Sequence, residues 1–362
     1  MSTNGQLNKL SQIDSLRGVA ILMVIVTHVC PRTIDVHSFI ASLCVYGRMG
    51  VQLFFVMSAL TLCLSMKARS NEGNALTKFY VRRFFRIAPV YYFGIALYTT
   101  ISVYQNSLGN VDFSDIFFHL TLTHAFSMDS FLSVVPGGWS IGVECAFYLV
   151  FPLLYKYLVD SDGYFRLIIG YVVAIICGVI SVQILALFFR IKEDPWEISY
   201  WNMFSQLPVF MAGLLLYKLY NISVMRGCSM LILWGGFLFC TIISLLSYKI
   251  KFPFHITLIT VFSSLSFVFL YFIFERKRYL NPVFLQNIGR ASYSMYIFHF
   301  VVMWGYFYLI NKYNFNTPSP GINLIVHFSI VVWFTYLISS LSMKLLENNF
   351  ILLGKRVINR MN

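Results

Sequence analysis

The sequence predicts an all-α polytopic membrane protein with about ten transmembrane helices, and three observations support this. Of the 362 residues, 58% are hydrophobic and 11% are charged, whereas a soluble domain carries roughly 25% charged residues. Several apolar stretches approach the roughly 20 residues that cross a bilayer as a helix. The 36 Phe, 23 Tyr and 6 Trp residues suit lipid and its interfaces with water. A water-soluble globule, a collagen, a coiled coil and a disordered chain are therefore excluded.

The apolar runs and their flanks place the helices in order along the chain. The run after Arg17 has no clear small-residue cleavage site, so the first helix is expected to be an uncleaved span. The connections are short, which predicts that residues 1–362 form a single integral membrane domain. The expected helices are 16–34, 49–66, 87–104, 139–159, 165–189, 201–217, 228–248, 254–274, 291–310 and 323–346.

A further apolar segment, residues 113–126, is too short to cross a bilayer easily. It contains Asp115, His119 and His124. These polar residues and its length of about 14 residues suit a possible re-entrant or interfacial segment better than a span.

The basic residues predict the orientation of the helices, because positively charged loops stay in the cytoplasm. With ten spans, 20 of the 27 Lys and Arg residues lie on the side of the N-terminus. Both termini are therefore expected to be cytoplasmic. An eleventh span at 113–126 would instead place residues 276–278 and the basic tail outside.

The net charge of +13 would suggest nucleic acid as a partner of a soluble chain, but no nucleic-acid motif occurs. The seven cysteines are odd in number and never spaced as metal ligands. We therefore expect no nucleic acid, no metal, and cysteines that act as small buried hydrophobes. Residues 160–162 (Asp-Ser-Asp) are interpreted as a solvated turn, and no Gly-rich phosphate loop is present.

Arg17 and His28 are the first pair of ionisable residues within an expected membrane helix. Placing such side chains inside a bilayer costs free energy, which points to a function. Eleven residues make about three helical turns, so both side chains share one face, about 16 Å apart. Such a face could hold a long anionic ligand, with His28 as a general base. In the alternative interpretation Arg17 reaches the inner headgroups and His28 bonds a neighbouring carbonyl.

A basic cluster, Arg82, Arg83 and Arg86, precedes the third expected span. Guanidinium groups bind phosphates through paired hydrogen bonds, so a cytoplasmic nucleotide or coenzyme A fits here. The alternative is that these residues only fix orientation and contact anionic lipid.

Two polar faces on later helices carry the remaining candidate functional residues. Ser140, Glu144 and Tyr148 recur every four residues behind Trp139 and form one stripe. Glu144 could orient a histidine or bind a sugar hydroxyl, or make a structural bond to another helix.

The second face carries Ser292, Tyr296 and His299, where hydroxyls could stabilise an oxyanion and His299 could act as a second acid or base. Interhelical bonding is the alternative. The remaining histidines are interpreted as loop or core residues: His37, His119, His124, His255 and His327.

Taken in order, these strings resemble the family-3 integral membrane acyltransferases, which include bacterial O-antigen acetylases and other enzymes that acylate surface glycans. The resemblance extends essentially from Asp14 to Phe350. It departs from the family at Ala59, where glycine is usual, which affects only local helix geometry. The matching residues are Arg17 and His28, Gly47 to Ser58, Arg82 to Pro89, Trp139 with Ser140, Glu144, Phe147 and Tyr148, Ser292 to Ser294 with His299, and Glu347.

The resemblance implies acetyl-CoA or another acyl-CoA as the cytoplasmic donor and a carbohydrate acceptor on the far side of a bacterial inner membrane. The chain ends about 16 residues after its last expected span, so the acceptor is expected to arrive as a lipid-linked glycan. His28 and Glu144 are the expected catalytic residues, and Arg17, Arg82, Arg83 and Arg86 the donor-binding ones. The expected substrate-binding residues are Trp139, Ser140, Tyr148, Ser292, Tyr293 and His299.

In the expected mechanism, His28 removes the proton of a sugar hydroxyl that attacks the thioester, or carries the acyl group itself. A polysaccharide or small-molecule transporter or flippase is the competing function, because it too places ionisable residues inside a helical bundle but needs no acyl donor. A structural scaffold is disfavoured, since it explains neither His28 nor Glu144 in an apolar setting.

Overall fold

The computed structural model describes most of the chain. Its described residues are 11–35, 38–105, 112–127, 130, 131, 133–160, 163–189, 196–222, 224–250, 254–313, 317 and 319–361. Regular structure in these ranges is helical throughout, without a strand. They include ten helices long and apolar enough to cross a membrane. The prediction of an all-α polytopic membrane protein is confirmed.

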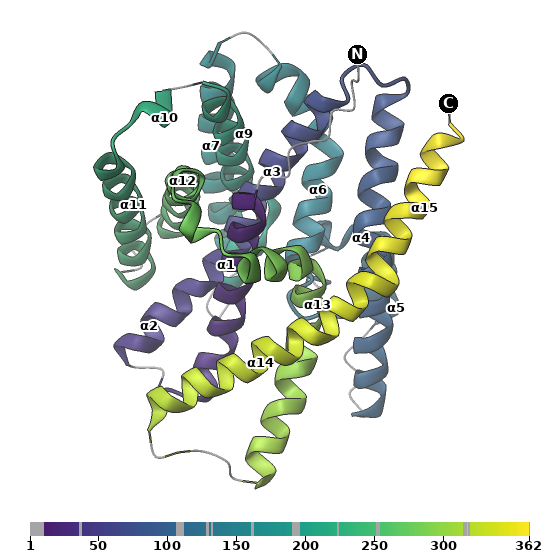
Figure 1. The fold of residues 1–362 in the computed structure, drawn as a ribbon, viewed down its shortest axis with the longest axis vertical. Coiled ribbons are helices and arrows are strands. Elements are labelled where there is room, and N and C mark those ends of the chain that lie inside the picture. Colours follow the sequence, from purple (N-terminus) through teal and green to yellow (C-terminus); the bar gives the residue numbers. More distant parts are fainter. Residues whose placement is uncertain are drawn as a thin grey trace.

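The helices are numbered along the chain in Figure 1. They are α1 (Ser11–Val29), α2 (Phe39–Val45), α3 (Gly50–Ala68), α4 (Ala75–Tyr104), α5 (Phe113–Leu120), α6 (Trp139–Leu154), α7 (Phe165–Phe189), α8 (Trp196–Trp201), α9 (Met203–Asn221), α10 (Val224–Gly227), α11 (Met230–Ile250), α12 (His255–Arg276), α13 (Val283–Tyr313), α14 (Pro320–Ser342) and α15 (Asn348–Asn359).

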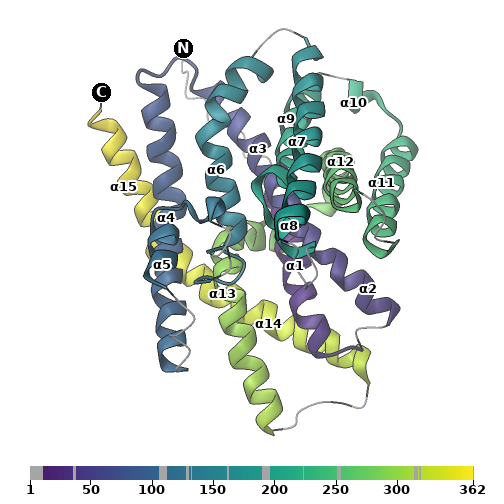
Figure 2. The same cartoon turned by 180° about the vertical axis from the view of Figure 1, so that it is seen from behind.

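Helix α1 lies in the middle of the bundle and packs against α3, α12, α13 and α14. Figures 1 and 2 show α11 and α12 on one side of α1, with α4, α5 and α15 on the other. Two glycines let α1 and α13 approach closely: a Cβ on Gly18 would lie 2.4 Å from the Leu285 carbonyl oxygen, and one on Gly289 1.7 Å from that of Asp14. The ion pair between Arg290 and Asp14, at 3.1 Å, joins the same two helices. The first helix is therefore held tightly against α13.

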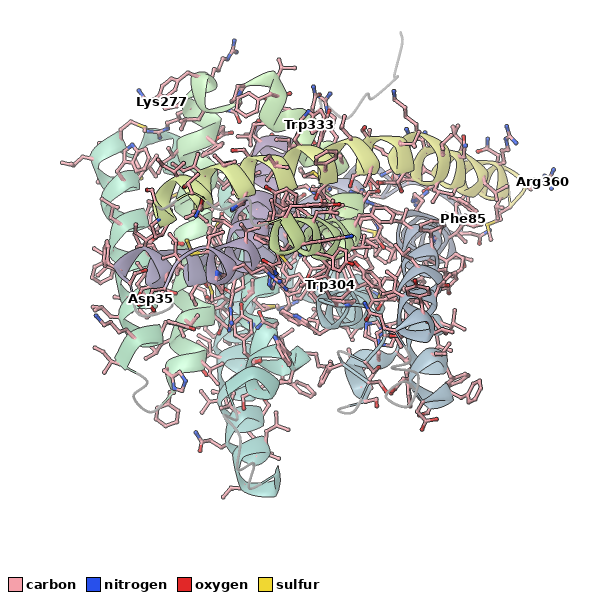
Figure 3. All side chains as sticks on the ribbon, turned by 90° about the horizontal axis from the view of Figure 1, so that it is seen from below. Asp35, Phe85, Lys277, Trp304, Trp333 and Arg360 are labelled. Atoms are coloured by element: carbon pink, nitrogen blue, oxygen red, sulfur yellow. The ribbon has the colours of Figure 1, made fainter. Side chains whose placement is uncertain are left out.

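The two ends of the bundle can be followed in Figure 1. The α3–α4 turn, α10 and the end of α15 lie at the upper end, and the end of α13 lies at the lower end. Helix α14 crosses the outside of the bundle and continues through a π-helical turn, Met343–Glu347, into α15. Figure 3 shows Trp333 on this long element and Phe85 beneath its C-terminal part. A cytoplasmic location of both termini remains a prediction.

Three helices begin or end well outside their expected ranges. Helix α4 begins at residue 75 instead of 87, α13 at 283 instead of 291, and helical structure after α14 continues to 359 instead of 346. The added turns interrupt their apolar residues with five Arg, four Asn and two Lys residues. Long basic side chains are good helix formers, but a search for apolar runs does not detect them.

The segment at 113–126 does not cross the bundle. It forms α5 and a short 3-10 turn, His124–Phe126. Helix α5 packs against α4, and the Tyr92 hydroxyl donates to the Leu120 carbonyl at 2.7 Å. Phe113 and Phe117 are exposed while Asp115 and His119 are buried. Its apolar face thus points away from the protein, as in an interfacial helix.

Candidate active site

Three cavities follow one another through the bundle and share lining residues. One cavity, beside α15, is called the cytoplasmic cavity after the predicted orientation of the chain, and it shares Arg83 and Arg86 with a second, inner cavity. The inner cavity shares Val51 and Tyr296 with the outer cavity, which His28 lines. The inner cavity is narrow, about 60 Å³, against about 340 Å³ for each of the others. The inner cavity, the smallest of the three, therefore lies between the two larger ones.

The structure brings most of the predicted site residues together. Trp139 lines the outer cavity with His28, Arg82 lines the cytoplasmic cavity, and His299 is buried behind His28. The other predicted residues all line the inner cavity: Arg17, Arg83, Arg86, Ser140, Glu144, Tyr148, Ser292 and Tyr293.

Glu144 is held on the wall of the inner cavity by two hydroxyl groups. Ser58 donates to its carboxylate at 2.5 Å and Tyr148 at 2.6 Å. The guanidinium of Arg83 lies 5.8 Å from the centre of the Tyr148 ring. These bonds explain how a carboxylate is accommodated inside the bundle. The two donors lie on α3 and on α6, the helix that carries Glu144. The imidazole of His28, which Glu144 was expected to orient, lines the outer cavity instead.

The junction between the inner and outer cavities is built around Tyr296. Its hydroxyl donates to the Gly137 carbonyl at 3.0 Å. The Ser140 hydroxyl lies 2.9 Å from Tyr296 Oη and 3.1 Å from the same carbonyl. Gly137 has a φ of 74°, a conformation that favours glycine. The start of α6 and the middle of α13 are thus joined at the boundary between the two cavities.

Two expected substrate-binding residues on α13, Ser292 and Tyr293, differ in the availability of their hydroxyl groups. Tyr293 already donates to the Ile87 carbonyl at 2.7 Å. The buried Ser292 hydroxyl has no hydrogen-bond partner among the described residues. Of the two side chains, Ser292 therefore has the hydroxyl that is not already engaged in the inner cavity.

His28 lies beside His299 and Phe300 instead of facing lipid. The ring centres are 5.5 Å apart for His28 and His299 and 4.6 Å apart for His28 and Phe300. His299 Nδ1 lies 2.7 Å from the Tyr296 carbonyl oxygen. A carbonyl can only accept, so Nδ1 carries the proton and Nε2 is left as an acceptor. That buried Nε2 has no hydrogen-bond partner in the described ranges.

Five aromatic side chains line the outer cavity: Trp139, Tyr200, Trp201, Tyr296 and Phe300. Trp139 lies 5.8 Å from Tyr200 and 6.3 Å from Trp201 between ring centres. Arg48 provides a cation on the same wall. Sequence reasoning missed Arg48, Tyr200 and Trp201 as site residues. Aromatic residues just before α9, at the expected outer interface, were the available signal.

Two histidines interpreted as loop or core residues, His119 and His124, form a buried network beside the start of α6. Their rings stack at 4.2 Å. Tyr91 Oη lies 2.7 Å from His119 Nδ1, and His124 Nε2 lies 2.8 Å from the Gly138 carbonyl oxygen. Burial, with the charge of His124 second, lowers the pKa of His119 to about 4. These two are core residues, as expected; His37 and the end of the Asp-Ser-Asp turn, residues 161 and 162, lie outside the described residues.

The lowered pKa of His119 predicts a loss of stability in acid. The unfolded chain binds a proton near pH 6.5, but the folded chain does so only near pH 4. Between these values the free energy of unfolding should therefore fall by about 1.4 kcal/mol per pH unit. His119→Gln should flatten the dependence of the melting temperature on pH in detergent. Equal slopes for both proteins would show that His119 is protonated in the folded state.

Two comparisons with known proteins found similar sequences. The model of the acyltransferase-3 family, described as an acyltransferase domain, matches residues 10–344. The peptidoglycan O-acetyltransferase OatA of Listeria monocytogenes is 28% identical over 207 residues, which are 52% of this chain and 30% of OatA. The chain thus aligns with less than a third of that relative. No solved structure matches the chain.

The family match covers every predicted site residue, from Arg17 on α1 to His299 on α13. It also covers all but the last part of the long α14–α15 element. Its extent and the ten helices lead to the same conclusion: this chain belongs to the acyltransferase-3 family of membrane acyltransferases.

Proposed function

We propose that this protein transfers an acyl group, most simply acetyl, from cytoplasmic acyl-CoA to a hydroxyl of a carbohydrate on the far side of a bacterial inner membrane. The acceptor is proposed to be a lipid-linked or other cell-surface glycan. The observation that carries this proposal is the row of three cavities, basic at one end and aromatic at the other, with His28 beyond the narrow junction.

The charges of the passage support an anionic donor at its cytoplasmic end. Arg17, Arg83 and Arg86 line the inner cavity, against one carboxylate, Glu144. Guanidinium groups bind phosphate through paired, charge-assisted hydrogen bonds. The narrow neck fits the thin pantetheine arm of coenzyme A better than its nucleotide, so the thioester would reach the junction while the phosphates stay behind.

The aromatic walls of the outer cavity support a carbohydrate acceptor, because sugar rings stack on aromatic faces. In the proposed reaction the oxygen of the sugar hydroxyl bonds to the carbonyl carbon of the thioester. At the same time an imidazole nitrogen of His28 takes the proton of that hydroxyl. The hydroxyl of Ser292 donates to the developing oxyanion. The C–S bond then breaks, and the coenzyme A thiolate leaves with the proton that His28 releases.

The reaction is tested with purified protein in liposomes, radiolabelled acetyl-CoA and two acceptor probes, N-acetylglucosamine oligosaccharides and soluble peptidoglycan fragments. Label is expected in an ester on the glycan, released by mild alkali. A transporter or flippase would move glycan without consuming acetyl-CoA. Movement of either probe with no ester formed would reject the proposed function in favour of that alternative.

The junction at Val51 gives a second prediction. Val51 is buried and lines both cavities. Val51→Phe should fill the neck and reduce acetyl transfer by roughly 10²-fold, since a thioester held short of His28 cannot react. Donor binding, measured with coenzyme A, should stay unchanged. Val51→Ala is the matched control and should keep transfer; equal activity of the Phe variant would show that the acyl group takes another path.

A further inference from the structure

The cytoplasmic cavity has a wall that the predicted site did not include, helix α15. Three parts of the chain surround the cavity: the end of α3 with the turn after it, the first turns of α4, and α15. A Cβ on Gly354 would lie 2.8 Å from Phe85 Cβ, so α15 sits directly on α4 and presents Lys355 to the cavity. The family match ends at residue 344, which places this wall outside the matched region.

The cavity gathers far more positive than negative charge. Its charged lining residues are Arg69, Glu72, Arg82, Arg83, Arg86 and Lys355. Five cations around one carboxylate repel one another unless an anion joins them. The cavity of about 340 Å³ leaves room for such an anion, and its charge fits one with several negative groups.

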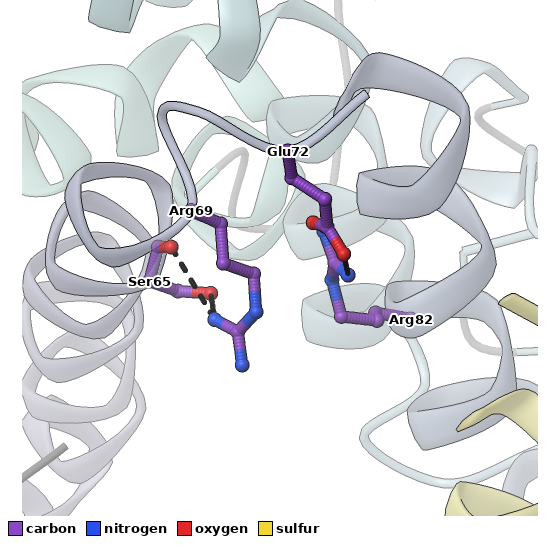
Figure 4. A network of polar contacts seen from close by, with 4 residues as sticks. All are labelled: Ser65, Arg69, Glu72 and Arg82. Atoms are coloured by element: carbon purple, nitrogen blue, oxygen red, sulfur yellow. Dashed lines mark hydrogen bonds and ion pairs between the residues drawn. The ribbon is translucent and has the colours of Figure 1, made fainter. Parts of the chain in front are cut away.

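Glu72 and Arg69 already hold part of this cluster in place (Figure 4). Both carboxylate oxygens of Glu72 accept from Arg82, at 2.8 and 3.2 Å. Arg69 Nη1 donates to the Ser65 hydroxyl at 2.6 Å. The hydrogen bond from Arg82 lowers the pKa of Glu72, so the carboxylate is ionised at neutral pH. The paired Arg82 and Glu72 side chains are 20% and 26% exposed, so a phosphate can reach them.

We infer that this cavity binds the 3′-phosphate of the donor's adenosine end through Arg69, Arg82 and Lys355, and that Glu72 holds Arg82 until the phosphate replaces its carboxylate. The inference rests on the proposed function for the identity of the donor. Coenzyme A ends in a ribose 3′-phosphate next to a pyrophosphate. Arg83 and Arg86 also line the inner cavity, so they are placed for the pyrophosphate. The other three cations of the cytoplasmic cavity are then left for the terminal phosphate.

Acetyl-CoA is compared with acetyl-dephospho-CoA, which lacks only the 3′-phosphate. The wild type is expected to show a KM roughly 10- to 100-fold higher for the dephospho donor, with kcat unchanged. Arg69→Gln and Lys355→Gln should raise the KM for acetyl-CoA and leave that for acetyl-dephospho-CoA unchanged. Arg356→Gln, next to Lys355 but outside the cavity lining, is the matched control and should change neither. Equal KM values for the two donors in the wild type would overturn the inference.

Direct binding of 3′,5′-ADP separates this inference from the proposed function. Binding by purified protein that Arg69→Gln and Lys355→Gln weaken would support the site even if no acetyl transfer occurred. Transfer from acetyl-CoA without such binding would uphold the function and reject the site. Glu72→Gln frees Arg82, so it should tighten 3′,5′-ADP binding by about 2- to 5-fold; weaker binding would contradict the displacement of the carboxylate.

An anionic lipid headgroup offers the same phosphate chemistry at this face of the membrane. The binding measurement is therefore made in nanodiscs of phosphatidylcholine and of phosphatidylglycerol. The inference expects 3′,5′-ADP to bind in both, with the same loss in the two variants. Binding that phosphatidylglycerol abolishes, or Arg69→Gln and Lys355→Gln effects confined to phosphatidylglycerol, would assign the cavity to lipid and overturn the inference.

Discussion

Replacing His28 by alanine is expected to lower kcat/KM for acetyl transfer by about 10²- to 10⁴-fold, the usual contribution of a positioned general base. His28 is the ionisable side chain of α1 that reaches the outer cavity, next to the junction at Tyr296. An alanine leaves the acceptor hydroxyl without a group to take its proton. The measurement is ester formation from radiolabelled acetyl-CoA by protein of verified monodispersity.

Two further variants show whether the loss is specific to His28. His327→Gln removes a histidine on α14 whose Nδ1 lies 2.7 Å from Tyr306 Oη and which lines none of the three cavities; it should keep transfer. His299→Phe replaces the imidazole ring whose centre lies 5.5 Å from that of His28, and a fall of about tenfold is expected because the larger ring disturbs the position of His28. Normal transfer by His28→Ala would remove His28 from the mechanism.

The membrane architecture followed from the sequence because bilayer thickness imposes a length on every apolar run. The same reasoning failed where helices leave the bilayer. The turns of α4 before residue 87 and the α15 helix are helical but carry basic residues, so hydropathy alone ended both elements too early. The α15 wall of the cytoplasmic cavity was lost with them, including Lys355.

The site was predictable as a set of helix faces but not as a set of contacts. Helical periodicity placed Ser140, Glu144 and Tyr148 on one face, and all three line the inner cavity. Periodicity carries no information on which helix such a face meets. The Ser58 donor to Glu144 lies 86 residues away in the sequence, and the position of His299 behind His28 depends on how closely α1 and α13 pack.

That packing depends on Gly289, and Gly289→Ala is expected to prevent accumulation of folded protein. The new methyl group would lie 1.7 Å from the Asp14 carbonyl oxygen, 2.7 Å from its carbon and 3.0 Å from the Gly18 nitrogen. All three are backbone atoms, so no side-chain rotation can relieve the clash. Overpacking usually lowers the free energy of unfolding by about 1–3 kcal/mol. We expect a loss at or above the top of that range here, because two helix backbones have to move apart. The roughly 1 kcal/mol by which alanine favours a helix over glycine is too small to offset it.

Gly305→Ala is the matched control, because it lies on the same helix with no atom within 4 Å of its added Cβ. It should leave the melting temperature unchanged or raise it slightly, since only helix propensity changes. The two variants are compared by melting temperature in detergent and by acetyl transfer from acetyl-CoA. Because α1 carries His28 and α13 carries His299, any Gly289→Ala protein that does fold should have lost transfer as well. Folded, active Gly289→Ala protein would mean that α1 and α13 do not meet at this glycine, and the placement of the two histidines side by side would fall with it.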